Sequence, residues 1–272
     1  LAASVGISLH SGGTADRTEE IAVTFTSSQI ALDALAALSP GGAKLTPSER
    51  ESRIKDLKGG TSLRGTALDS FLTGLKALHD MVGPITPTME KPLIPGTDPL
   101  IDAIVEIEDV LNQTLPAGHM YAIPAADDYP GAVPKEAHRI EKKVTIDGTW
   151  RGWLSGRGAG GWGAKEMRPT GLYAAPGEII TVTAPSEFQG TGFEIVIGAY
   201  NGNLSDRDKW NRYPRLQRAT EIAGPITTIS NALGGLITIR VPKGAAFSSL
   251  DFTVSGGVEA PLYLAGKTDL RE

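Results

Sequence analysis

Residues that commonly bind metals or activate nucleophiles are scarce in this chain. Its 272 residues include four histidines, His10, His79, His119 and His138, and no cysteine. No two of these histidines have the spacing of zinc ligands, and the motif His-Glu-x-x-His does not occur. The absence of cysteine also excludes a thiolate nucleophile and a disulfide framework. We therefore predict no catalytic residue, no metal ligand and no cofactor within this chain.

Two further patterns are of a kind that ligand sites use, and both fit a surface turn better. The glycine-rich run Gly156 to Gly163 lacks the Gly-Lys-Ser/Thr ending of a phosphate-binding loop, and no helical pattern follows it. Asp206-Arg207-Asp208 lacks the glycine and glutamate of a calcium loop. Neither pattern is assigned a ligand.

Clustered tryptophans give the one compositional indication of a binding surface. Trp150, Trp153 and Trp162 lie within 13 residues. Exposed aromatic rings on a sheet can stack against sugar rings. The alternative is that Trp150 and Trp153 pack into the core, which leaves Trp162, amid glycines, as the better candidate for substrate contact. Both interpretations remain open at this point.

The overall composition excludes several classes of protein. The chain is 40% hydrophobic and 21% charged, with a net charge of -5. No stretch approaches the roughly 18 apolar residues of a membrane helix, so no membrane span is expected. The negative balance argues against nucleic acid as a partner, because phosphate contacts require a basic face. A folded chain with a sizeable core is expected.

Charge and residue type change near residue 135. Residues 1–135 contain 10 Lys+Arg and 17 Asp+Glu, whereas residues 136–272 contain 16 and 14 together with all four tryptophans. Leu and Ala with helix-capping residues dominate the first part, and short alternating apolar runs dominate the second. We predict an α+β chain in two domains, with a helical domain over 1–116, a linker over 117–139 and a β-sandwich over 140–272.

Four helices are predicted in the first domain, where they form a small bundle. One is a short helix capped by Ser27 and Ser28 that runs through Leu38. A second begins with Thr46-Pro47-Ser48-Glu49, a capping box with proline at the first helical position. Apolar residues spaced by three and four predict the other two, over Leu68 to Val82 and Leu100 to Leu115. A strand over Ile21 to Phe25 is predicted to precede them.

Period-two patterns after Lys142 predict a jelly-roll-like antiparallel sandwich of seven short strands. The predicted strands are Val144 to Asp147, Ile179 to Ala184, Phe193 to Ala199, Pro225 to Ile229, Leu236 to Val241, Phe247 to Val254 and Glu259 to Leu264.

Three segments of the second half resemble motifs of one family, the enhancin-like zinc metallopeptidases. The first, Thr170-Gly171-Leu172-Tyr173 with Gly177-Glu178, is similar to the Thr-Gly-Leu-Tyr-x-x-x-Gly-Glu strand entry of that family. Trp210-Asn211-Arg212-Tyr213-Pro214 resembles its Trp-x-Arg-x-Pro element. Asn231-Ala232-Leu233-Gly234-Gly235-Leu236-Ile237 resembles a third motif, with Ala232 in place of the usual proline. The helical half has no recognised match.

The resemblance implies a function for the longer protein. In that family these motifs belong to a β-sandwich that precedes the catalytic domain, and its members are secreted gluzincins that cleave mucins and other O-glycosylated proteins. Zinc is thus implied for a catalytic domain outside this chain. The motif residues are expected to be structural, except that Arg212 is also a candidate for substrate contact. The structural set is Gly171, Tyr173, Gly177, Trp210, Pro214, Gly234 and Gly235.

The leading hypothesis is a bacterial, secreted accessory scaffold. The chain would be the N-terminal part of an enhancin-like zinc metallopeptidase, inactive alone, with its own catalytic domain and mucin-type O-glycoproteins as partners. The alternative is a stand-alone carbohydrate- or glycoprotein-binding module that uses the segment from Trp150 to Trp162. A third hypothesis is a purely structural interaction domain.

Overall fold

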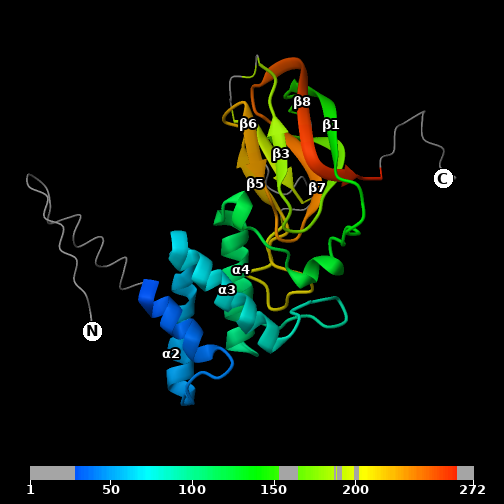
Figure 1. Cartoon of the computed structure of the whole chain (residues 1–272). Coiled ribbons are helices and arrows are strands. Elements are labelled where there is room, and N and C mark those ends of the chain that lie inside the picture. The colour runs from blue at the N-terminus through cyan, green and yellow to red at the C-terminus, as the bar shows by residue number, and fades with distance from the viewer. Residues whose placement is uncertain (1–27, 153–164, 187, 189–191, 199–201, 262–272) are drawn as a thin grey trace, which may run out of the picture. The chain divides into compact units, whose positions relative to one another are not determined.

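The structure, a computed structural model of the whole chain, describes residues 28–152, 165–186, 188, 192–198 and 202–261 (Figure 1). It mixes helices with an antiparallel sheet, as predicted. Internal contacts divide the chain into two compact units. The first unit joins the residues up to Gly83 with Pro99–Ile107, and the second joins Pro84–Asp98 with Glu108 onward. The predicted bounds at 116 and 139 stay a prediction.

The four predicted helices are present in the described residues. The 3-10 turns η1, η2 and η3 accompany them. The helical segments are residues 28–38, α2 (Pro47–Leu57), η1 (Lys58–Ser62), α3 (Gly65–Val82), α4 (Pro99–Thr114), η2 (Ala117–His119) and η3 (Pro124–Asp127).

Local sequence explains where α2 begins. The Thr46 hydroxyl accepts a hydrogen bond from the Glu49 backbone N–H at 3.3 Å, and the Glu49 carboxylate accepts one from the Thr46 N–H at 2.8 Å. This reciprocal capping box satisfies two donors that a helix start otherwise leaves unpaired, and Pro47 presets the first helical φ. The predicted start of this helix is therefore confirmed.

Apolar side chains from several helical segments build the core of the first unit. Phe71, Leu75 and Leu78 of α3 are fully buried. Leu35 lies so close to Gly74 that a Cβ on Gly74 would stand 2.3 Å from its Cδ2 atom. The three- and four-residue spacing read from the sequence therefore marks the buried side of α3.

The second unit contains an eight-stranded antiparallel sheet. Its strand order is β5-β4-β7-β2-β8-β3-β6, and β1 pairs with β8 as well (Figure 1). The strands are β1 (Ile140–Thr149), β2 (Lys165–Ala174), β3 (Ile180–Thr183), β4 (Glu194–Ile197), β5 (Arg218–Glu221), β6 (Ile226–Ile229), β7 (Gly235–Pro242) and β8 (Ala246–Glu259).

Strand β8 makes the sheet nearly closed because it serves two sets of partners. Residues 246 to 257 pair with β1, and residues 253 to 255 also pair with β3. Val258 and Glu259 instead pair with β2. Strand β8 thereby joins the β1-β8-β3-β6 strands to the β2-β7-β4-β5 strands. Both sets of strands face the same core.

Strands β2 and β5 were not predicted from the sequence. Strand β2 contains Pro169 and Gly171, two residues that normally weaken a strand, and its pairing with β7 shifts register between Pro169 and Leu172. A bulge absorbs both residues there. The predicted strand over Glu259 to Leu264 is corrected, because Glu259 ends β8, residues 260 and 261 are in no strand, and 262–264 lie outside the described residues. The predicted strand over Ile21 to Phe25 also lies outside them.

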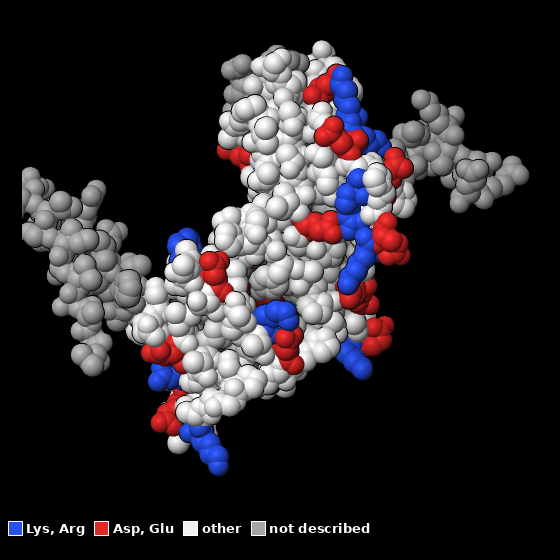
Figure 2. All heavy atoms as spheres, in the orientation of Figure 1, with Lys and Arg blue, Asp and Glu red and all other residues white. Residues whose placement is uncertain are grey.

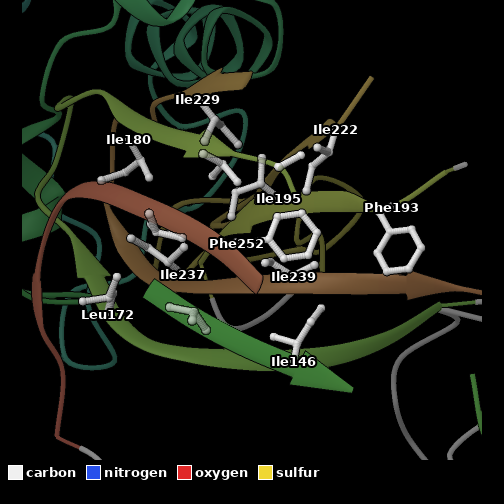
Figure 3. Packing of buried hydrophobic residues seen from close by; sticks show 14 of the residues in the cluster. Ile146, Leu172, Ile180, Phe193, Ile195, Ile222, Ile229, Ile237, Ile239 and Phe252 are labelled. Carbon is white, nitrogen blue, oxygen red and sulfur yellow. The ribbon is translucent and has the colours of Figure 1, made fainter. Parts of the chain in front are cut away.

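The core of the second unit lies between the two sets of strands. Phe193, just before β4, and Phe252 of β8 are fully buried, and Ile195, Ile237 and Ile239 extend the same apolar cluster (Figure 3). The Phe188 ring meets the Phe193 and Phe252 rings edge to face, with centroids 5.2 and 5.5 Å apart. Such T-shaped contacts are the favoured aromatic geometry.

Charged side chains line the outer surface of β1 and β8. Charges of both signs lie there (Figure 2). Lys142 pairs with Glu259 at 3.7 Å, and Lys143 pairs with Asp251 at 2.7 Å.

Among the described residues, no helix has the length and apolarity that crossing a membrane requires.

Candidate functional site

The second half of α4 is bonded to the segment that carries the third motif. The Asn112 side chain donates to Asn231 Oδ1 at 3.1 Å, and its own Oδ1 accepts from the Ala232 N–H at 2.8 Å. Asn231 is fully buried and donates to the Ile197 and Leu216 carbonyls at 3.0 and 2.8 Å. Asn231 thus fixes three separate backbone segments at one point.

A buried carboxyl group lies one turn earlier on α4. Glu108 is 2% exposed, and it accepts hydrogen bonds from Tyr213 Oη at 2.5 Å and Tyr121 Oη at 3.4 Å. Burial raises the pKa of Glu108 to about 7, although the two phenol hydrogen bonds act to lower it. A carboxyl group in this state exchanges its proton near neutral pH.

The Trp210 to Pro214 motif forms the end of a groove. Trp210 is buried and exchanges two backbone hydrogen bonds with Leu93, each 2.8 Å long. The Arg212 guanidinium donates to the Tyr213, Pro214 and Gly202 carbonyls at 2.7, 3.0 and 2.9 Å. Arg212 therefore braces its own loop, which is one of the two roles considered for it, and its role in substrate contact stays a prediction.

We call this hollow the Arg212 groove. Its volume is about 310 Å³. It lies between three segments that are distant in sequence, and its lining residues are Thr88, Met89, Glu90, Asp128, Tyr129, Asn211 and Arg212. Carboxylates, an amide, an aromatic ring and a thioether are thus presented together on one concave surface.

Motif glycines are required where the backbone leaves no room for a side chain. Gly177 has φ +75°, and a Cβ there would stand 2.7 Å from the Ala122 nitrogen. Gly234 has φ +64°, and its Cβ would stand 2.5 Å from the Ala174 carbonyl oxygen. Only glycine adopts such φ values at low cost beside another backbone segment. These contacts are consistent with the structural role expected for the motif.

The remaining motif residues hold strand ends and loops. The Tyr173 hydroxyl donates to the Gly131 carbonyl at 2.8 Å, and the Gly171 carbonyl accepts from the Ala260 N–H at 3.1 Å. Gly235 opens β7, and Pro214, which is buried, accepts from the Leu204 N–H at 3.0 Å. None of these four residues lines the Arg212 groove.

Of the three clustered tryptophans, only Trp150 lies in the described residues. Trp150 is half-buried and packs against the sheet core, with Lys243 Nζ 5.8 Å from its ring centroid. Trp153 and Trp162 lie outside the described residues. A sugar platform that uses all three rings therefore stays a prediction.

A buried ion pair holds the residues that follow Trp150. Glu166 Oε1 accepts from the Arg151 and Gly152 N–H groups at 3.0 and 2.6 Å, and Glu166 Oε2 lies 3.0 Å from Arg168. Arg168 also donates to the Asp147 and Thr149 carbonyls, both at 2.8 Å. Burial acts to raise the pKa of Glu166, but these donors together lower it.

The residues present do not fit the zinc site that the family resemblance implies. His79 is buried on α3, His119 lies in η2, His138 precedes β1, and His10 lies outside the described residues. Within the described part of the chain, no three His, Asp or Glu side chains are grouped as metal ligands would be. No zinc-dependent step is therefore assigned to this chain.

Most residues of the Arg212 groove carry no signal in the sequence. Arg212 and its neighbour Asn211 belong to a recognised motif, but Glu90 lies in the Pro-rich connection and Asp128 and Tyr129 lie in the predicted linker. Loops that come together only in the folded chain show no common spacing of residues in the sequence, so no motif marks them. The burial of Glu108 could not be recognised from the sequence either, because its position on the helix is an ordinary polar one. Its contact with Tyr213 forms only in the folded chain.

Residues 135–255 match the N-terminal domain of M60-like peptidases. All three motifs fall within this range, so the resemblance to the enhancin-like peptidases is confirmed over this part of the chain.

Similar proteins are found among curated sequences and solved structures. TRPM8 channel-associated factor 3 of Rattus norvegicus is 33% identical over 103 residues, 38% of this chain and 11% of that protein. TRPM8 channel-associated factor 1 of Homo sapiens is 31% identical over 133 residues, 49% of this chain and 13% of that protein. The metallopeptidase IMPa of Pseudomonas aeruginosa, solved in complex with an O-glycopeptide, is 17% identical with a TM-score of 0.46, covering 85% of this chain and 26% of IMPa.

The chain is much shorter than the proteins it resembles. It spans 11 to 13% of the length of these two curated relatives and about a quarter of the IMPa chain.

Proposed function

We propose that this chain is the N-terminal accessory part of an M60-like, enhancin-like zinc metallopeptidase that acts on mucin-type glycoproteins. The observation that carries the proposal is the match of residues 135–255 to the N-terminal domain of M60-like peptidases. The proposal includes an extracellular, bacterial location, because mucin-type substrates lie outside cells. Its partners would be its own catalytic domain and the O-glycosylated substrate.

Buried polar contacts support a scaffold role. Asn231 bonds to α4 and to the carbonyls of Ile197 at the end of β4 and of Leu216. The Arg212 guanidinium holds the Tyr213 and Pro214 carbonyls of the second motif and the Gly202 carbonyl before it. Buried hydrogen-bond networks of this kind favour one arrangement of the backbone. A rigid arrangement is what a domain needs if it is to support a neighbour or present a substrate to it.

The proposal extends to the finer architecture. We infer a helical bundle domain followed by a jelly-roll-like sandwich, each folding around its own core. The separate apolar clusters around Phe71 and around Phe252 support this division.

Zinc chemistry is assigned to a catalytic domain of the longer protein. There a zinc ion would polarise the scissile carbonyl and activate a water molecule. This chain alone is accordingly expected to be inactive.

Two measurements test this proposal. The reading frame beyond Glu272 should encode a His-Glu-x-x-His motif with a downstream glutamate, and the longer protein should cleave mucin until a chelator removes its zinc. The 272-residue chain, dialysed and analysed for metal, should retain no zinc and leave mucin intact. A stop codon directly after Glu272, or one tightly held zinc per chain with chelator-sensitive cleavage, would contradict the proposal.

A further inference from the structure

The Arg212 groove exposes apolar and acidic groups side by side. Met89 is 73% exposed and Tyr129 is 49% exposed. The Glu90 and Asp128 carboxylates, which line the same groove, take part in no hydrogen bond or ion pair with another described residue. The groove therefore offers an aromatic face together with two hydrogen-bond acceptors that the protein itself does not use.

Hydrogen-bond donors line the same surface. The Asn211 amide donates to the Met89 sulfur, which is a weak acceptor. A ligand hydroxyl group could readily replace the sulfur as the acceptor of this hydrogen bond. A ligand that fits must therefore both donate and accept hydrogen bonds and must present an apolar face to Tyr129. A sugar ring has these properties, because its hydroxyls serve in both roles and its C–H faces stack on aromatic rings.

Backbone hydrogen bonds within the chain hold the segments around the groove. Leu93 and Trp210 hold the Pro-rich connection to the second motif through two 2.8 Å hydrogen bonds. The Tyr129 N–H donates to the Ala125 carbonyl at 3.1 Å at the end of η3. A preformed site loses less conformational entropy when a ligand binds.

We propose that the Arg212 groove binds an uncharged saccharide of an O-glycosylated protein. This inference rests on the proposed function for the identity of the glycan carrier, while the preference for an uncharged sugar follows from the groove itself. Glu90 and Asp128 place two negative charges in it against the single positive charge of Arg212. The Arg212 guanidinium already donates to three backbone carbonyls, so it is a poor clamp for the carboxylate of a sialic acid.

Calorimetric titration of the full chain tests the proposal directly. The probes are a threonine glycopeptide that carries the uncharged disaccharide galactosyl-N-acetylgalactosamine, the same glycopeptide with sialic acid added, the bare peptide and a lysine-rich peptide. We expect the uncharged glycopeptide to bind at least about tenfold more tightly than the other three. Equal binding of the sialylated form, or preferential binding of the lysine-rich peptide, overturns the proposal.

Variants place the binding in the groove. Tyr129→Ala removes the stacking surface, and the double change Glu90→Gln with Asp128→Asn removes the acceptor charges. Each is expected to weaken binding about tenfold and to leave the unfolding midpoint unchanged, because the side chains are exposed. Matched controls are Ile226→Ala, a 65% exposed apolar residue outside the groove, and Glu136→Gln, an exposed acidic residue outside it.

The two proposals fail separately. Glycopeptide binding that the groove variants leave unchanged, or no binding at all, removes the groove proposal, even when the longer protein proves to be a zinc-dependent mucin peptidase. A chain that binds the uncharged glycopeptide through Tyr129, but whose reading frame stops after Glu272, keeps the groove proposal and removes the peptidase.

Discussion

Asn112 and Asn231 are joined by a buried side-chain hydrogen bond across 119 positions of sequence. Asn112 donates to Asn231 Oδ1 at 3.1 Å and accepts from the Ala232 N–H at 2.8 Å, and Asn231 Oδ1 also accepts from the Leu233 N–H at 3.0 Å. Both side chains are almost completely buried. The contact joins the last turns of α4 to the third family motif.

Replacing Asn231 should be among the most destabilising changes in the second unit. Asn231→Ala removes the donor to the Ile197 and Leu216 carbonyls and the acceptor of the Leu233 N–H, and each buried hydrogen bond lost in this way costs about 1 to 3 kcal/mol. We expect a loss of about 3 to 5 kcal/mol in the free energy of unfolding, measured by urea denaturation. A double-mutant cycle with Asn112→Ala should give a coupling of about 1 kcal/mol or more. Independent, additive effects would show that the two amides do not act together.

Local signals predicted the helices well because their causes lie within a few residues. The capping box of Thr46 and Glu49, and the spacing of Leu68, Phe71 and Leu75, depend only on neighbours in sequence. Strand β2 escaped prediction because its Pro169 and Gly171 are tolerated only through a bulge against β7. That compensation is supplied by a strand about 70 residues away, which no local pattern reports.

The candidate site was the least predictable part of the molecule. Its motif residues Asn211 and Arg212 could be recognised, but Glu90 and Tyr129 come from segments that the sequence marks only as connections. The Leu93–Trp210 hydrogen bonds that hold the segment of Glu90 beside this motif use backbone atoms and therefore leave no trace in residue type. Side-chain motifs are read from a sequence more easily than backbone pairings.

Glu108 should make stability fall as the pH rises. Its folded pKa of about 7 lies above the ordinary glutamate value of 4.5, so the folded chain binds the proton more tightly than the unfolded chain does. This stabilisation is fully present below pH 4.5 and is lost as the pH rises through 7. Its full size corresponds to roughly 3 kcal/mol.

The comparison of wild type with Glu108→Gln isolates this effect. Urea denaturation from pH 4.5 to 8 should show a steeper decline for the wild type than for the variant, which cannot titrate at this position. Glu136→Gln, at an exposed site, should leave the wild-type slope unchanged. Parallel pH profiles for wild type and Glu108→Gln would mean that Glu108 keeps an ordinary pKa.

Glu166 should have the opposite pH dependence. Burial acts to raise its pKa, but Arg168 and two backbone N–H groups lower it overall, so the folded chain prefers the ionised form. The stabilisation it contributes is therefore present above pH 4.5 and is lost as the pH falls below that value. Glu166→Ala should cost about 3 to 5 kcal/mol at pH 7, because it removes the carboxylate that pairs with Arg168 and that accepts from the Arg151 and Gly152 N–H groups. An Asp251→Asn control, at an exposed pair, should cost less than about 1 kcal/mol, and a similar loss in both variants would contradict the assignment.

Trp150 should behave as a packing residue. Its ring is half-buried against the sheet core and lies beneath Lys243 Nζ, so little of it is free for a ligand. Trp150→Ala should lower the free energy of unfolding by about 1 to 3 kcal/mol and leave glycopeptide binding unchanged within twofold. Lys243→Met, which removes only the cation above the ring, should cost about 0.5 to 1 kcal/mol. If Trp150→Ala instead abolished binding without changing the unfolding midpoint, the sugar platform would lie at Trp150 and not in the Arg212 groove.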